Sequence, residues 1–400
     1  MHYYPVLSIL LILTLACTTK PIPTANAPVL ESPSLPNPMA QHQTGSPLFN
    51  SMILSITEDS LGHYWIGSWC DGLCKYDPSA SSTEARYTYY TTDNGLPYSE
   101  MTQYNNRKIP KGHSPRNVQT DHRGHIIFAT IGGVVKYDGK TFSEIEVQQP
   151  SQLITAHSAN LVSADNWDEL NQIWFGNIDG NGVFRYDGEK LVHLTFPEAH
   201  SITSRFSKYA TYSIGKDNNG NLWFGTEAGG IFRYNKDSLT CINKNAEKGI
   251  VRAIFQDASG KVWISNVLQG LQYYDHQAYL AGDDYFKNFT DQKGYYNLSE
   301  TRTYDYLDKN KILDSVQSIA QDDDGILWFG TFTRGLWRYN PKANSQKGEE
   351  ELIHYTEETG LPHNTVKTIY KDKSGRLLFG IGEEEASVYY FKDGEFLRLR

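Results

Sequence analysis

"NNGNLWFGTEAGGIFRYN", residues 218–235, places a turn, a Trp-Phe-Gly, a second turn and an Arg-Tyr close together. Related stretches recur along the chain, so the segment is one copy of a repeated unit and not a unique catalytic or nucleotide-binding turn. The seven copies cover residues 58–77, 120–138, 169–187, 218–235, 256–275, 321–340 and 371–391. Residues 50–400 therefore hold about 50 residues per copy, a length that suits a four-stranded unit.

Each copy predicts four strands, named A to D in chain order, and no helix. Strand A is an alternating apolar run, such as residues 211–217. It ends in Asp-x-x-Gly, where the aspartate caps a tight turn and the glycine accepts a positive φ. "LWFGT" predicts strand B, "GIFRY" strand C, and the more variable "LTCINK" (239–244) strand D. The third copy lacks the turn glycine, while Ile127 and Leu378 replace the strand B tryptophan in copies two and seven.

A single sheet of this kind cannot bury both of its faces. Stacking the copies radially buries the faces, and closing the ring protects the sheet edges. The predicted fold class is therefore all-β. It is a seven-bladed β-propeller with four antiparallel strands per blade, over residues 49–400.

The N-terminal residues predict an export signal followed by a tether. Residues 1–17 contain an apolar run that is too short to span a bilayer, and they end in "LTLAC", which resembles a bacterial lipobox with Cys17 as the lipidated residue. Cleavage after Ala16 without lipidation is the alternative, and both interpretations export the chain. Residues 18–48 are rich in Pro, Ser and Thr and predict a disordered tether. We expect a periplasmic, outer-membrane or cell-surface location, with a lipid anchor as the only membrane contact.

Charge argues against one class of partner. The formal net charge is −9 and no run of Lys or Arg occurs. Binding to phosphate backbones requires basic clusters, so we expect no nucleic-acid partner.

The repeats resemble the two-component regulator propeller repeat, found in the extracytoplasmic ligand-sensing domains of bacterial hybrid sensor kinases. The Asp-x-x-Gly, Leu-Trp-Phe-Gly-Thr, Gly-Leu and Arg-Tyr-Asp pattern is met well in copies one, four and six, and the connecting phrase Tyr-Thr-x-x-x-Gly-Leu-Pro occurs at 90–97 and 355–362. The resemblance covers about residues 50–400 and implies non-catalytic binding of a small molecule, glycan, peptide or envelope protein such as a sensor kinase. It implies no cofactor. Because neither a membrane helix nor a kinase is visible in the chain, we expect signalling to pass through a separate partner.

Loops that diverge on a regular scaffold are the usual place for a binding site. In a propeller, the B–C loops and the D–A connections between blades lie on one face, and the A–B turns lie on the other. Aromatic and polar side chains mixed there suit a sugar or peptide, with ordinary loop variation as the alternative. The candidate ligand-binding residues are Trp69, Arg116, Asn177, Asp179, Glu227, Phe332, Arg334, His363 and Asn364.

We predict no metal site and no catalytic residue. "DDDG" (322–325) lacks the spacing of a calcium loop, and the histidines His113, His157 and His363 precede blades two, three and seven, which are not three consecutive blades of the ring. "DDDGILWFGT" (322–331) also resembles the repeat of streptogramin B lyases, which are metal-dependent propellers, but it has Gly-Thr where that repeat prefers Thr-Glu. A lyase is therefore one alternative function, and a scaffold in an envelope complex is another.

The first B–C turn lies between Cys70 and Cys74. In an exported protein these cysteines could form a hairpin-tip disulfide. Cys74, however, occupies the position of Phe232 and Trp337 in other copies, which favours a buried thiol. Both interpretations stay open.

Overall fold

The structure is a computed structural model, and it describes part of the chain. The described residues are 48–97, 102–104, 107–109, 114–130, 133–148, 160–161, 172–176, 182–196, 209–243, 249–283, 285–295, 313, 315–344 and 349–400. Cys17 and the rest of the predicted leader, together with residues 18–47 of the predicted tether, lie outside these ranges. Their assignment stays a prediction.

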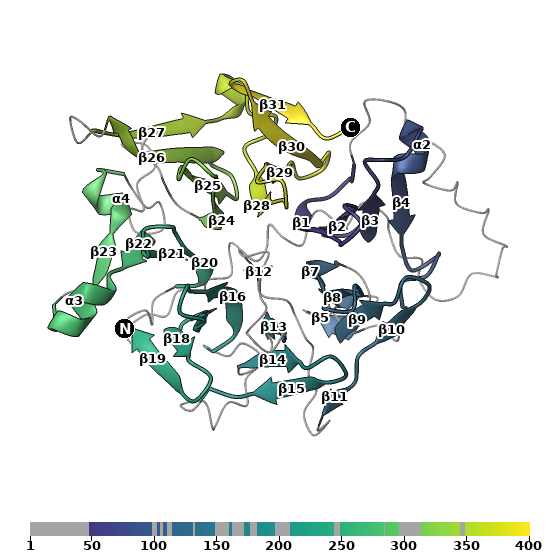
Figure 1. The fold of residues 1–400 in the computed structure, drawn as a ribbon, viewed down its shortest axis with the longest axis horizontal. Coiled ribbons are helices and arrows are strands. Elements are labelled where there is room, and N and C mark those ends of the chain that lie inside the picture. Colours follow the sequence, from purple (N-terminus) through teal and green to yellow (C-terminus); the bar gives the residue numbers. More distant parts are fainter. Residues whose placement is uncertain are drawn as a thin grey trace.

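Seven sheets stand around a common axis, which confirms the predicted seven-bladed β-propeller (Figure 1). The chain starts each regular blade at the innermost strand and moves outward, so strand A lies nearest the axis. The first three sheets contain β1 (Ile53–Glu58), β2 (Tyr64–Ser68), β3 (Leu73–Tyr76) and β4 (Tyr87–Tyr90); β7 (Arg116–Thr120), β8 (Ile126–Thr130), β9 (Gly133–Tyr137) and β10 (Phe142–Glu144); and β13 (Ile173–Gly176), β14 (Val183–Tyr186), β15 (Leu191–Leu194) and β11 (Val147–Gln148).

The four remaining blades follow the same order from the axis outward. They contain β16 (Thr211–Lys216), β17 (Leu222–Thr226), β18 (Ile231–Tyr234) and β19 (Leu239–Asn243); β20 (Val251–Gln256), β21 (Val262–Asn266), β22 (Gly270–Tyr274) and β23 (Phe286–Asn288); β24 (Val316–Gln321), β25 (Leu327–Thr331), β26 (Leu336–Asn344) and β27 (Glu349–Tyr355); and β28 (Val366–Lys371), β29 (Leu377–Ile381), β30 (Ser387–Lys392) and β31 (Glu395–Arg398).

Blade three departs from the regular pattern in its strand pairing. Its outermost strand, β11, leaves blade two and pairs parallel with β15, which covers the outer edge of that sheet. A further short strand, β12 (Asn160–Leu161), pairs parallel with β16 of blade four. The expected strand A of blade three is not paired with β13 among the described residues.

In the described part of the chain, helices occur in short connections. Between β4 and β7 the chain forms a hairpin of β5 (Thr102–Tyr104) and β6 (Arg107–Ile109), and on either side of β23 it forms the helices α3 (His276–Ala281) and α4 (Phe289–Gln292). Blade one adds α2 (Thr83–Arg86), and a 3-10 turn η5 (Glu357–Thr359) precedes blade seven. Within the described ranges, no helix has the length and apolar character needed to cross a membrane.

The hydrophobic core is divided into seven clusters, and each cluster is shared by two neighbouring blades. The cluster between blades seven and one includes Ile53, Tyr64 and Leu378, so the last blade packs directly on the first. Polar contacts cross the same boundary. Tyr64 donates its hydroxyl hydrogen to Asp372 Oδ2 at 2.9 Å, and the Leu48 N–H donates to the Ala386 carbonyl at 2.9 Å. The ring is therefore closed by packing of whole sheets.

Strand B requires a glycine at this position because neighbouring blades pack closely. A Cβ added at Gly225 would overlap Val251 of the next blade, and one added at Gly380 would overlap Ile53 across the ring closure. Only glycine leaves room for the neighbouring inner strand at this distance. The "LWFGT" motif is thus a packing motif.

The A–B turns confirm the predicted capping role of the aspartate and add a second role. In blade four, Asp217 Oδ1 accepts the backbone N–H groups of Asn219 and Asn221, while Oδ2 accepts the Trp223 indole N–H at 2.8 Å. The same Asp-to-Trp bond, six residues apart, occurs in blades one, five and six. One carboxylate therefore holds the turn and also satisfies a buried indole.

Candidate functional site

The inner strands share an irregularity at one height along the axis. In five of them the pairing with strand B skips a single residue near the start of the strand, which is the geometry of a β-bulge. A bulge re-aims the side chain of the extra residue. The skipped residues are Leu54, Tyr212, Arg252, Gln317 and Lys367. In blade two the shift follows Arg116, the first residue of β7.

Side chains at these positions contact one another across blade boundaries. Lys367 Nζ of blade seven donates to Gln317 Oε1 of blade six at 2.9 Å. Arg252 of blade five places its Cζ 4.8 Å from the centre of the Tyr212 ring in blade four. Residues at the bulged positions therefore meet across two of the blade boundaries.

Three cations of these inner strands each lie over an aromatic ring of the preceding blade. Arg116 Cζ lies 4.4 Å from the centre of the Trp69 ring, and Lys367 Nζ lies 5.2 Å from that of Phe332. The third pair is Arg252 with Tyr212. These distances are those of cation–π attraction. All six residues are intermediate in exposure.

We call this group the inner cluster, and it also contains two carboxylates. Glu227 Oε2 accepts the Tyr212 hydroxyl at 3.3 Å, and Glu383 Oε1 accepts the Thr365 hydroxyl at 2.9 Å. The inner cluster consists of Trp69, Arg116, Tyr212, Glu227, Arg252, Gln317, Phe332, Lys367 and Glu383.

The electrostatics of the cluster are those of an enclosed space. Burial lowers the pKa of Lys367 well below its usual range, the positive charges of Arg252 and Arg116 lower it further, and the Glu383 carboxylate opposes them. Burial raises the pKa of Glu227, while the Tyr212 hydrogen bond and the Arg252 charge act in the opposite direction. Both shifts disfavour the charged form of the side chain.

Four of the residues proposed from the sequence belong to the inner cluster, namely Trp69, Arg116, Glu227 and Phe332.

Asn364 and Glu357 brace one loop by reciprocal bonds, in which Asn364 Oδ1 accepts the Glu357 N–H and Glu357 Oε1 accepts the Asn364 N–H. His363 Nδ1 accepts the Thr365 N–H at 3.0 Å, and the Arg334 N–H donates to Thr331 Oγ1 at 2.8 Å. Asn177 and Asp179 lie outside the described residues.

Sequence reasoning missed Tyr212, Arg252, Gln317 and Lys367 because it placed the site in loops alone. All four occupy the second residue of an inner strand, in the runs "TYSI", "VRAI", "VQSI" and "VKTI". The flanking residues are small or β-branched, whereas this single position varies in size and charge. That contrast between copies was the available signal.

Of the two interpretations left open for Cys70 and Cys74, the structure has the buried thiol at Cys74 and not the bridge. Cys74 is a free thiol in β3, and its side chain is fully buried in the core between blades one and seven. Its position in strand C explains this, because the equivalent residues of other blades are core residues such as Phe232.

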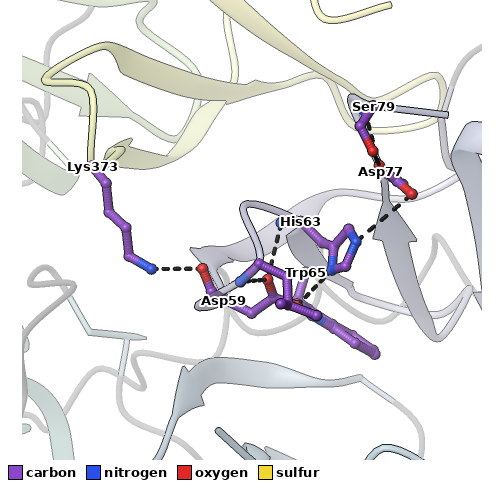
Figure 2. Close-up of polar contacts among 7 residues, drawn as sticks. Asp59, His63, Trp65, Asp77, Ser79 and Lys373 are labelled. Atoms are coloured by element: carbon purple, nitrogen blue, oxygen red, sulfur yellow. Dashed lines mark hydrogen bonds and ion pairs between the residues drawn. The ribbon is translucent and has the colours of Figure 1, made fainter.

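The opposite face carries a second polar network, drawn in Figure 2. His63 Nδ1 lies 2.9 Å from Asp59 Oδ2, its Nε2 lies 3.7 Å from Asp77 Oδ2, and Lys373 Nζ donates to the Asp59 backbone oxygen at 2.6 Å. The position of His63 in the turn is filled in blade four by Asn221, whose side-chain amide also donates to the turn aspartate. We therefore interpret His63 as a structural residue of the A–B turn. In the described part of the chain, no group of three or more His, Cys, Asp or Glu side chains is placed to hold a metal ion.

With the fold and the inner cluster described, the chain can be compared with known proteins. Residues 205–228 and 311–333 match the family model of the two-component regulator propeller. Histidine kinase P4 of Formosa agariphila is 27% identical over 206 residues, which make up 50% of this chain and 13% of that protein. The chain thus spans a small part of the length of this curated relative.

Solved structures agree with the fold. The extracellular domain described as part of the hybrid two-component system BT3049 of B. thetaiotaomicron has a TM-score of 0.55 at 18% identity, covering 88% of this chain and 47% of that one. A catalytically inactive virginiamycin B lyase of Staphylococcus aureus with quinupristin has a TM-score of 0.52 at 13% identity, covering 85% and 94%. At these identities the likeness establishes the propeller fold alone.

Proposed function

We propose that this protein is an exported, non-catalytic propeller that binds a ligand or partner at the inner cluster, as a sensing module does. The observation that carries the proposal is the set of three cation–aromatic pairs on inner strands, with all six residues intermediate in exposure. Aromatic faces beside hydrogen-bonding groups are the composition expected of a recognition site. The match of two repeats to the two-component regulator propeller supports a sensing context.

The ligand class follows from the same composition. Trp69, Tyr212 and Phe332 supply flat apolar surfaces, and Gln317 supplies an amide beside them. A glycan, a peptide or another small molecule fits such a surface, and an envelope protein such as a sensor kinase would present a loop to it. Export through residues 1–17, with lipidation at Cys17 and a tether over 18–48, would hold the ring clear of the membrane.

The lyase alternative is not proposed. The likeness to the virginiamycin B lyase rests on the fold alone. A scaffold would bind its partner without using the inner cluster. A variant that removes aromatic residues of the cluster therefore distinguishes a scaffold from a sensing module.

The proposal is tested by screening the purified full-length chain on glycan and peptide arrays and by recovering partners from envelope extracts. The double variant Trp69→Ala, Phe332→Ala should lose the captured ligand. Tyr279→Ala is the matched control, because Tyr279 is an exposed aromatic residue on the outer helix α3. Ligand capture that survives the double variant, or a blank result from both arrays and extracts, would contradict the proposal.

A further inference from the structure

An amine, an aromatic ring and a carboxylate meet at the boundary between blades six and seven. Lys367 Nζ of blade seven lies 5.2 Å from the centre of the Phe332 ring of blade six. The Phe332 carbonyl oxygen lies 2.5 Å from Thr365 Oγ1, and the same Oγ1 lies 2.9 Å from Glu383 Oε1. Direct contacts therefore hold Lys367, Phe332 and Glu383 together in one place.

Few donors reach the Glu383 carboxylate. The Thr365 hydroxyl has one proton, so the Phe332 carbonyl and Glu383 Oε1 share it. Within the described ranges, no hydrogen bond reaches Glu383 Oε2, and Glu383 belongs to no ion pair. A carboxylate can accept about four hydrogen bonds. This one therefore keeps acceptor capacity for a ligand.

Lys367 is short of acceptors in the same way. Its amine donates to Gln317 Oε1 at 2.9 Å, and it has no ion-pair partner among the described residues. A protonated amine has three donors, so donor capacity is left over. Burial lowers the pKa of Lys367, and the Glu383 carboxylate opposes that shift. A bound carboxylate would act in the same direction as Glu383 and favour the charged amine.

The two protein groups match a ligand that carries both a carboxylate and an ammonium group. Lys367 and Glu383 are not within ion-pair distance of each other, so neither satisfies the other. A neutral sugar would leave both groups without a counter-charge, whereas an α-amino acid supplies one to each through charge-assisted hydrogen bonds. The Phe332 ring offers an apolar face for the rest of the molecule. All three residues are intermediate in exposure.

We propose that Lys367, Glu383 and Phe332 form a subsite for a zwitterionic α-amino acid with an apolar side chain. Lys367 receives the carboxylate, Glu383 receives the ammonium group, and Phe332 packs on the side chain. This inference names the ligand class for the proposed function and rests on it.

The experiment is calorimetric titration of the full-length chain with L-phenylalanine and L-leucine. Three further compounds serve as comparisons: hydrocinnamate lacks the ammonium group of phenylalanine, phenethylamine lacks its carboxylate, and galactotriose is uncharged. We expect an amino acid to bind, and each comparison compound to bind about tenfold more weakly or worse, because each loses at least one charge-assisted hydrogen bond.

Variants connect each ligand group to its residue. Lys367→Met should weaken phenylalanine about tenfold and leave phenethylamine unchanged, since phenethylamine has no carboxylate to lose. Glu383→Gln should weaken phenylalanine by a similar factor and leave hydrocinnamate unchanged. Glu384→Gln is the matched control, because Glu384 is an exposed carboxylate on the same turn, and Lys140→Met removes an exposed amine from an outer turn. Both controls should bind like the unaltered chain.

Circular dichroism and thermal unfolding of each variant separate a lost site from a lost fold. The inference is overturned if neither amino acid binds, if galactotriose binds as tightly as phenylalanine, or if folded Lys367→Met or Glu383→Gln keeps full affinity. A ligand from the arrays or extracts that depends on Trp69 and Phe332, but on neither Lys367 nor Glu383, would contradict this inference and leave the proposed function standing. The absence of any ligand in all of these experiments would contradict both.

Discussion

The two faces of the ring use the same repeat in opposite ways. At the A–B turns, blades one, four, five and six keep an aspartate that accepts backbone N–H groups and a buried indole N–H. At the bulged positions of the inner strands, successive blades present Leu54, Tyr212, Arg252, Gln317 and Lys367. The turn aspartate, which satisfies buried N–H groups, is the same in these copies of the repeat. The bulged residue differs from copy to copy, and we propose that ligands bind there.

Blades two and seven show what happens when the indole is lost. Where Ile127 replaces tryptophan, Asp121 Oδ2 contacts His125 Nδ1 at 2.9 Å. Where Leu378 replaces it, Asp372 Oδ2 accepts the Tyr64 hydroxyl and the Arg376 Nε–H. The turn carboxylate finds a donor in each case, because an unsatisfied buried carboxylate is costly.

The largest expected effect is on the turn face. Asp217→Ala removes the acceptor of the Trp223 indole and of two backbone N–H groups, and should lower the free energy of unfolding by about 3 kcal/mol. Urea denaturation followed by tryptophan fluorescence measures it. Asp237→Ala, at an exposed turn of the same blade, should change stability by less than about 0.5 kcal/mol. Equal losses of stability in Asp217→Ala and Asp237→Ala would contradict the structural role given to the turn aspartate.

The ring closure should be the next most sensitive point. Tyr64→Phe deletes the hydroxyl that donates to Asp372 and accepts from Arg376, and should cost about 1 to 2 kcal/mol. Thermal unfolding is the measurement. Tyr279→Phe, on the exposed helix α3, is the matched control and should leave the melting temperature unchanged. An unchanged melting temperature in Tyr64→Phe would show that sheet packing alone closes the ring.

The two faces should also respond to pH with opposite signs. Burial tends to raise the pKa of Asp59, but hydrogen bonds from Trp65 and His63 outweigh it and lower the pKa. Its contribution to stability is therefore present above the unfolded pKa of about 3.9 and lost as the pH falls below it. The pKa of Glu227 is raised, so its carboxylate costs stability as the pH rises above about 4.3.

Asp59→Asn should accordingly flatten the acid limb of the stability curve. Glu227→Gln should instead gain stability relative to the unaltered chain as the pH rises from 4 to 7. Denaturant unfolding at a series of pH values tests both variants together. Parallel curves for the two variants would contradict the opposite pKa directions.

The smallest expected effect is at the binding position itself. Lys367→Met removes an amine whose charged form is disfavoured by burial, and should raise the free energy of unfolding by up to about 1 kcal/mol. Lys140→Met should leave it unchanged. A clear loss of stability in Lys367→Met would mean that this lysine stabilises the fold. That result would contradict the proposed difference between the two faces.

Much of the fold could be predicted because its determinants are local. Asp217, Gly220 and Trp223 lie within one turn and the following strand, so the turn and strand pattern repeats visibly in each copy. The site was predicted in part. Loop divergence singled out Trp69, Glu227 and Phe332, which belong to the inner cluster, and also His363 and Asn364, which hydrogen-bond within their own loop. The bulged residues could not be predicted, because a bulge depends on how two strands pair and the sequence does not show that pairing.

The sequence by itself determined the repeat, the four strands of a blade and the packing residues, since each depends on neighbours a few positions away. Tertiary structure decided which residues meet at the axis. Arg116 meets Trp69, Arg252 meets Tyr212 and Lys367 meets Phe332 only because neighbouring blades stack in the ring. The same closure buries Cys74 between the first and last blades, where proximity in sequence had suggested a bridge to Cys70.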